Sequence, residues 1–138
     1  MRLAFRPPLG EDIENPAMEL LHQLIVSPDP GYWDEGSGGG TVDYFTEQSK
    51  TSLMIFPHST HGVYLRFYDE KNNPWLSLGN KEKLSECVEC NDEWYISVGL
   101  FVAKEKAWLA VRDFCLSGRK SPEVKWIPPS EIPDDGNW

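Results

Sequence analysis

The segment from residue 93 to residue 126 constrains the fold of this chain more than any other. It reads EWYISVGLFVAKEKAWLAVRDFCLSGRKSPEVKW, which predicts a strand (Glu93–Val102), a helix (about Ala103–Ser117) and a short closing strand that ends at Trp126. Gly118 stands where a left-handed residue commonly caps a helix. The segment is scaffold, because no side chain in it is an obvious catalyst. Apolar residues recur at helical spacing and predict one buried stripe: Ala103, Ala107, Ala110, Val111 and Phe114.

Several other segments have the composition of β-strands. Residues 41–47, 51–56, 62–68 and 75–78 are rich in β-branched and aromatic side chains, and short strands are expected at 3–5 and 87–88. Asn15 followed by Pro16 predicts a second helix over 16–27, with Asn15 as its N-cap. The sequence therefore predicts an α+β fold, in which a mostly antiparallel sheet of about five or six strands is packed by two helices.

Length and charge limit the class of protein. The 138 residues suit a single domain, 1–138, and the prolines and paired aspartates of 128–138 predict an extended, loosely attached tail. The net charge of −9, from 22 acidic and 13 basic residues, disfavours direct binding to nucleic acid, which usually needs a basic patch. We see no apolar run long enough for a membrane span and no signal peptide, so we expect a cytoplasmic protein.

Residues 28–40, PDPGYWDEGSGGG, predict a loop. A phosphate-binding loop needs a Gly-Lys-Ser/Thr ending, and only Thr41 follows the glycines here. The favoured interpretation of Gly36–Gly40 is a flexible connector, and the sequence leaves open whether it orders on binding.

Two short motifs could serve a metal or a redox reaction. Cys87 and Cys90 form a CxxC, His58 and His61 form an HxxH, and both residue types bind tetrahedral zinc. A redox CxxC usually precedes a helix, and no helical pattern follows this one. Free thiols without a cofactor are the favoured interpretation. A small zinc-binding protein, or a scaffold or adaptor, remains the alternative.

Two segments carry a family resemblance: VYLRFYDEKNNPWLSLGN (63–80) and VAKEKAWLAVRDFCLSGRKSPEVKW (102–126). Together they resemble the first immunity family of bacterial polymorphic-toxin systems, which includes proteins that protect against cytidine deaminase toxins. The likeness covers about residues 62–127. In that family a hairpin with an acidic turn precedes a valine-led helix and a closing strand. The family often opens this helix with a serine or proline cap, whereas Ala103 stands here. The residues that fit are Ala110 and Phe114 in the helix, and Gly118, Pro122, Val124 and Trp126 at its end.

The resemblance implies a non-enzymatic inhibitor that binds a cognate toxin, most plausibly a nucleic-acid deaminase or nuclease, and covers its active site. A toxin of that kind is expected to have a basic cleft, which an acidic and aromatic surface would complement. No G-x-S-x-G, H-E-x-x-H or Walker motif is present, so no catalytic residue is predicted. The sequence identifies neither the toxin nor the oligomeric state. The expected contact residues are Trp33, Asp34 and Glu35 on the glycine-rich loop, and Tyr68, Asp69, Glu70 and Trp75 around the hairpin.

Overall fold

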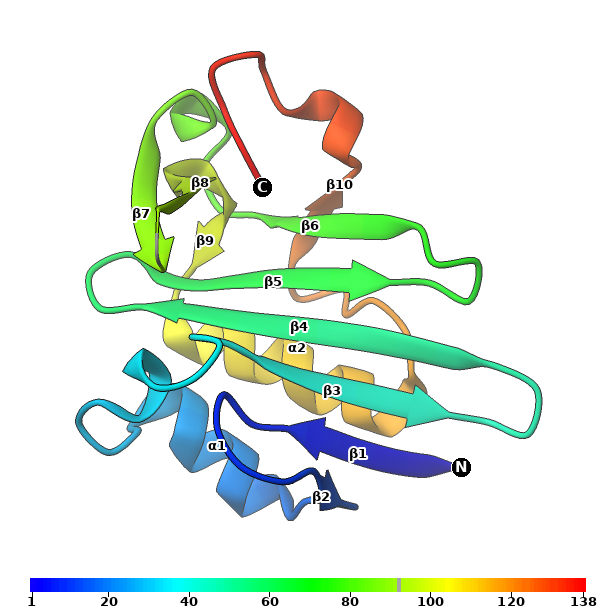
Figure 1. Ribbon diagram of the computed structural model, residues 1–138. Helices are drawn as coiled ribbons and strands as arrows, with labels where there is room; N and C mark the ends of the chain where they lie inside the picture. The colour runs from blue at the N-terminus through cyan, green and yellow to red at the C-terminus, as the bar shows by residue number, and fades with distance from the viewer. Residues whose placement is uncertain (92) are drawn as a thin grey trace.

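The antiparallel pair of β4 (Lys50–His58) and β5 (Gly62–Tyr68) lies at the centre of the fold, in a computed structural model that describes residues 1–91 and 93–138. Every strand pairing among these residues is antiparallel. The main sheet has eight strands in the order β10-β6-β5-β4-β3-β1-β2, with β9 beside β5, and β7 and β8 form a separate hairpin (Figure 1). The α+β prediction is confirmed, and the predicted count of five or six strands is too low.

The remaining elements complete the sheet and its two layers. The helices are α1 (Met18–Val26) and α2 (Lys104–Ser117). Single turns of 3-10 helix lie between these elements and in the C-terminal tail: η1 (Tyr32–Asp34), η2 (Lys81–Lys83), η3 (Val98–Leu100) and η4 (Pro129–Glu131). The other strands are β1 (Arg2–Arg6), β2 (Ile13–Glu14), β3 (Gly40–Phe45), β6 (Pro74–Leu78), β7 (Cys87–Asn91), β8 (Trp94–Ser97), β9 (Phe101–Val102) and β10 (Lys125–Ile127).

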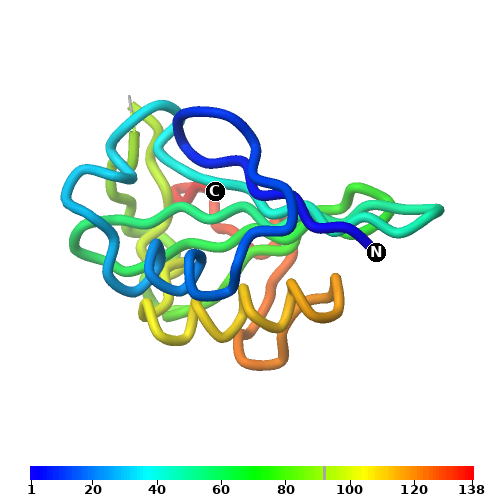
Figure 2. Tube along the Cα trace, turned by 90° about the horizontal axis from the view of Figure 1, so that it is seen from below, coloured from blue at the N-terminus to red at the C-terminus, as the bar shows by residue number. Residues whose placement is uncertain are grey.

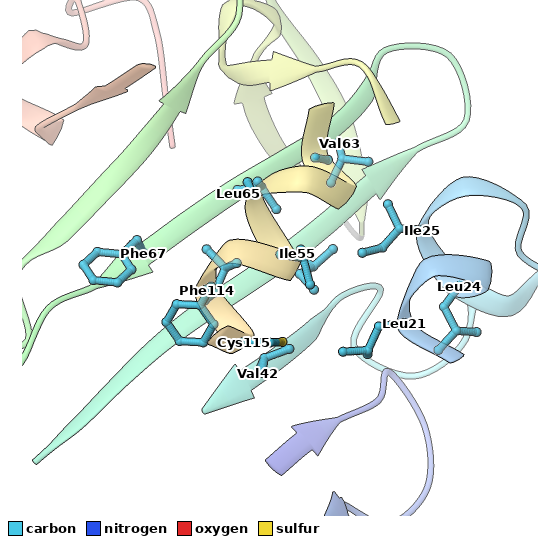
Figure 3. Close-up of a cluster of buried hydrophobic side chains, with 14 of the residues drawn as sticks. Leu21, Leu24, Ile25, Val42, Ile55, Val63, Leu65, Phe67, Phe114 and Cys115 are labelled. Carbon is cyan, nitrogen blue, oxygen red and sulfur yellow. The ribbon is translucent and has the colours of Figure 1, made fainter. Parts of the chain in front are cut away.

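Both helices cover the same face of the sheet, and the β3–β4 and β5–β6 hairpins project beyond them (Figure 2). The main core lies between these layers, where burial of each large apolar side chain contributes about 1.5–3 kcal/mol. Within the described residues, no helix has the length and apolar character needed to cross a membrane. Figure 3 shows side chains of the main core: Leu21, Leu24 and Ile25 from α1, Phe114 and Cys115 from α2, and Val42, Ile55, Val63, Leu65 and Phe67 from the sheet.

A second, smaller core lies on the opposite face of the sheet. Phe56, Tyr64 and Leu76 alternate with residues of the main core, so they point away from the helices. The η2 turn, the β7–β8 hairpin and the C-terminal tail cover them. The central strands are therefore buried on both faces over part of their length.

The segment after Trp126 corrects the prediction of a loosely attached tail. The backbone N–H of Ser97 donates to the carbonyl of Asn137 at 2.9 Å, and the N–H of Asn137 donates to the Ser97 hydroxyl at 2.9 Å. The rings of Trp138 and the side chain of Ile132 pack against the second core. The prolines shaped the tail, but its apolar residues attach it to the sheet.

Two local predictions near strand ends are also wrong. The expected strand 93–102 divides into β8, η3 and β9, because the carbonyl of Gly99 accepts the N–H groups of Gly79 and Asn80 at 2.7 and 3.0 Å. Asn15 is not a helix cap, since Ala17 precedes the first residue of α1. Its side chain accepts the N–H of Leu3 at 3.2 Å and fastens the turn after β2 to β1.

The end of α2 confirms the predicted glycine stop. Gly118 has a φ of 71° and its N–H donates to the carbonyl of Phe114 at 2.7 Å. A Cβ at this position would lie 2.5 Å from the ring of Tyr44, so both conformation and space require glycine.

Replacement of Phe114 by alanine tests how much the helix-side core contributes. Phe114 is 1% exposed and contacts the rings of Tyr44 and Phe67. We expect Phe114→Ala to lower the free energy of unfolding by about 3–5 kcal/mol in urea titrations. Leu116→Ala is the matched control, since Leu116 is on the same helix and 71% exposed, and it should change stability by less than about 0.5 kcal/mol. Similar losses for both variants would contradict this assignment of the core.

Candidate functional site

One cavity combines apolar walls with an acidic mouth. It has a volume of about 190 Å³ and lies at the end of the sheet where β4 turns into β5. The loop after α1 forms one wall, the turn after β4 forms another, and Lys104 at the start of α2 lies beside them. The lining residues are Ile25, Pro28, Asp29, Pro30, Gly31, Tyr32, Trp33, Asp34, Pro57, His58, Ser59 and Lys104.

Trp33 fixes the shape of this cavity from the inside. Its indole N–H donates to the carbonyl of Leu24, in the last turns of α1, at 2.7 Å, and its ring meets Tyr32 edge-on at 5.1 Å. Only 9% of Trp33 is exposed. Trp33 therefore offers little of its surface to a partner, and its role as a contact residue stays a prediction. The tryptophan holds the loop in place so that other residues can face outward.

Two of the three exposed carboxylates of the loop line the cavity. Asp29, Asp34 and Glu35 are exposed, and Asp29 and Asp34 also line the cavity. Burial, and then the charge of Glu35, raises the pKa of Tyr32, so its phenol stays neutral and can donate a hydrogen bond. Lys104 is the basic residue of the lining. This arrangement suits a ligand that has an apolar body and a cationic group.

The glycines after the loop are closely packed, which differs from the predicted flexible connector. The N–H of Ser37 donates to the carbonyl of Pro8 at 3.0 Å, and the Asn91 amide donates to the carbonyl of Ser37 at 2.8 Å. A Cβ on Gly36 would lie 1.8 Å from the carbonyl oxygen of Pro8. The glycines therefore permit close backbone approach, which orders the loop without a ligand.

The HxxH motif organises a turn. The Nδ1 atom of His58 accepts the backbone N–H groups of Thr60 and His61 at 3.1 and 3.4 Å, between β4 and β5. Burial, and then the neighbouring His61, lowers the pKa of His58, which keeps the ring neutral and able to accept these bonds. The histidine therefore contributes to the cavity wall by shaping the turn.

The CxxC motif lacks the reactive thiolate of a redox site. Burial, followed by the charges of Cys87 and Glu89, raises the pKa of Cys90 to about 11, so this thiol stays protonated and is not an activated nucleophile. In the part of the chain that the structure describes, no three His, Cys, Asp or Glu side chains are grouped as metal ligands. His58, His61, Cys87 and Cys90 are therefore not gathered into a preformed ligand set among these residues, and the zinc alternative stays a prediction.

The predicted hairpin residues lie at the opposite end of β5, about 20 Å from the cavity by strand length (Figure 1). Asp69 builds the turn, because its carboxylate accepts the N–H groups of Asn73 and Lys71 at 2.9 and 3.0 Å, and these bonds hold its pKa below the ordinary value. Trp75 is half-buried beneath the Lys120 ammonium, which lies 3.6 Å from the ring centroid. Glu70 is exposed.

The structure thus separates the predicted contact residues into two surfaces that one small partner site would not span. The cavity brings Asp34 together with residues that were not among the predicted contacts, namely Asp29, Tyr32 and Lys104. The prolines around Tyr32 and Trp33 were the available signal for a fixed aromatic loop. No protein-family model, curated protein or solved structure matches this chain.

The buried thiols give a direct test of the CxxC interpretation. With pKa values of about 11 for Cys90 and about 12 for Cys115, each thiol is ionised in roughly a thousandth of molecules or fewer at pH 8. We expect iodoacetamide to alkylate both at least about a hundredfold more slowly in the folded protein than in urea, as measured by peptide mass spectrometry. Equal rates at Cys90 in the two states would restore the reactive-thiol interpretation.

Proposed function

We propose that this protein is an immunity protein that binds a cognate bacterial toxin, a nucleic-acid deaminase or nuclease, and blocks its active site in the cytoplasm. The observation that carries the proposal is the cavity whose apolar walls end in the carboxylates of Asp29 and Asp34, with Glu35 exposed next to Asp34 in the sequence. The family resemblance over 62–127 is the second support. Its two segments fold side by side, since β5, β6 and β10 are adjacent strands and α2 packs on β5.

Charge supports a basic partner. The chain has a net charge of −9, and the loop that forms one wall of the cavity carries three exposed carboxylates, Asp29, Asp34 and Glu35. A nuclease or deaminase needs a basic cleft to hold its substrate, so the two surfaces would attract each other before contact. Apolar and aromatic groups that become buried afterwards would slow dissociation.

A binding role also agrees with the titratable groups. Four of the groups with shifted pKa values have structural roles or are shielded from solvent: Asp69 builds a turn, His58 builds another, and the thiols of Cys90 and Cys115 are half-buried and buried. The adaptor alternative has no separate observation in its favour.

Rescue from a toxic neighbour tests the function as a whole. The reading frame next to the gene for this protein is expressed from an inducible promoter, alone and together with this chain. We expect growth arrest in the first case and growth in the second, and copurification of the two proteins. A toxic neighbour that this chain neither binds nor neutralises would remove the immunity proposal.

Charge reversal tests which end of the sheet binds. We expect Asp34→Lys combined with Glu35→Lys to lower the association rate constant for the toxin by about tenfold at low salt, with a smaller effect at high salt. The matched control is Glu47→Lys with Glu70→Lys, which changes the net charge equally at two exposed positions of the hairpin end. Surface plasmon resonance at two salt concentrations measures both. A loss confined to the second variant would place the interface at the hairpins.

A further inference from the structure

One cation on the second face of the sheet is surrounded by aromatic rings. The guanidinium carbon of Arg66, on β5, lies 4.8 Å from the ring centroid of Trp138, 5.5 Å from those of Phe56 and Tyr64, and 5.7 Å from that of Trp94. These rings belong to four separate segments: β4, β5, β8 and the tail. Cations are attracted to ring faces, so the rings hold the guanidinium in one position.

The hydrogen bonds of Arg66 leave part of its guanidinium free. Its Nε donates to the Tyr64 hydroxyl at 3.0 Å and one Nη donates to the Tyr68 hydroxyl at 3.3 Å. Of the five N–H donors of an arginine, the others have no partner among the described residues. No side-chain N or O atom in this part of the chain is both buried and without a partner, so the second Nη reaches solvent.

Arg66 differs from three of the other four arginines; the fourth, Arg119, is exposed and likewise has no carboxylate within 4 Å among the described residues. Three arginines with exposed side chains pair with carboxylates, yet the partly buried Arg66 has no acidic partner within 4 Å among the described residues, in a chain with 22 acidic residues. A cation withdrawn from water without a counter-charge is costly unless dipoles and rings replace the water. The three pairings are Arg2 with Glu14, Arg6 with Asp12 and Asp43, and Arg112 with Asp113.

The free donors have the geometry of an oxyanion receptor. A guanidinium presents parallel N–H groups that match the two oxygens of a carboxylate. The hydroxyl of Tyr68 accepts a hydrogen bond from Arg66, and its own hydrogen remains available to donate to the same anion. Burial raises the pKa of Tyr64 to about 12, so this phenol stays neutral beneath the cation.

We propose that Arg66 and Tyr68 form a receptor for a carboxylate that a partner protein presents to the second face of the sheet. The net charge of −9 repels free anions and attracts a basic protein surface, so a carboxylate carried on such a surface reaches the site more readily. The proposal rests on the proposed function for the identity of the partner, and the receptor itself can be tested on the protein alone.

Anion titration by NMR tests the receptor. The Arg66 Nε–H signal and the indole N–H signals of Trp94 and Trp138 are followed while acetate or inorganic phosphate replaces chloride. The ionic strength is held constant, so that salt screens the electric field of the whole chain equally throughout. We expect saturable shifts with both anions. Arg66→Lys keeps the charge and loses the parallel N–H groups of the guanidinium, so it should weaken binding of both anions at least about tenfold. Arg119→Lys is the control, since Arg119 is exposed at the end of α2, and it should leave the shifts unchanged.

The two variants and the two anions distinguish a carboxylate receptor from a free-phosphate site and from no site at all. Tyr68→Phe keeps the ring and loses the hydroxyl, so it should weaken binding even if Arg66→Lys fails to fold. Shifts no larger than those in chloride, or shifts that both variants retain, would overturn the receptor and leave the immunity proposal untouched. Phosphate bound far more tightly than acetate would identify free phosphate as the ligand and exclude a carboxylate from a protein. Comparable weak binding of both anions supports a carboxylate delivered by a partner.

Discussion

The pairing of β4 with β5 is the interaction on which the rest of the structure depends. In this pair Leu53 and Ile55 lie opposite Phe67 and Leu65 and face the helices, while Phe56 and Tyr64 face the other way. One hydrogen-bonded ladder therefore supplies two cores. A slip of one residue would exchange the two faces and place the Arg66 guanidinium against α2, so burial on both sides fixes the register strongly. The cavity, the aromatic cluster and the projecting hairpins all keep their positions because this register is fixed.

Local sequence signals predicted what local interactions determine. The bounds of β5 followed from strand propensity, and the end of α2 at Gly118 followed from the glycine cap. The predictions that were wrong concerned features that depend on contacts between residues far apart in the sequence. The break at Gly99 comes from Gly79 and Asn80, and the attachment of the tail comes from Ser97. No periodicity within either segment encodes a partner that is many positions away.

The candidate site illustrates the same limit. Aromatic and acidic residues on the loop after α1 marked it as a surface of interest, but a sequence does not distinguish an aromatic residue that faces a partner from one that fixes a loop. Trp33 belongs to the second kind, because its N–H is used by Leu24. Likewise, the carboxylate of Asp69 closes its own turn. Whether either residue also contacts a partner stays a prediction.

The distribution of tryptophans has a practical consequence for anyone who handles this protein. Trp33 is in the wall of the cavity, Trp94 and Trp138 lie beside Arg66, and Trp75 lies beneath Lys120 at the hairpin end. An indole emits at a wavelength that depends on its surroundings, so each region has its own intrinsic fluorophore. Variants that retain one tryptophan at a time would report optically, and without added dyes, on the part of the surface that a bound molecule covers.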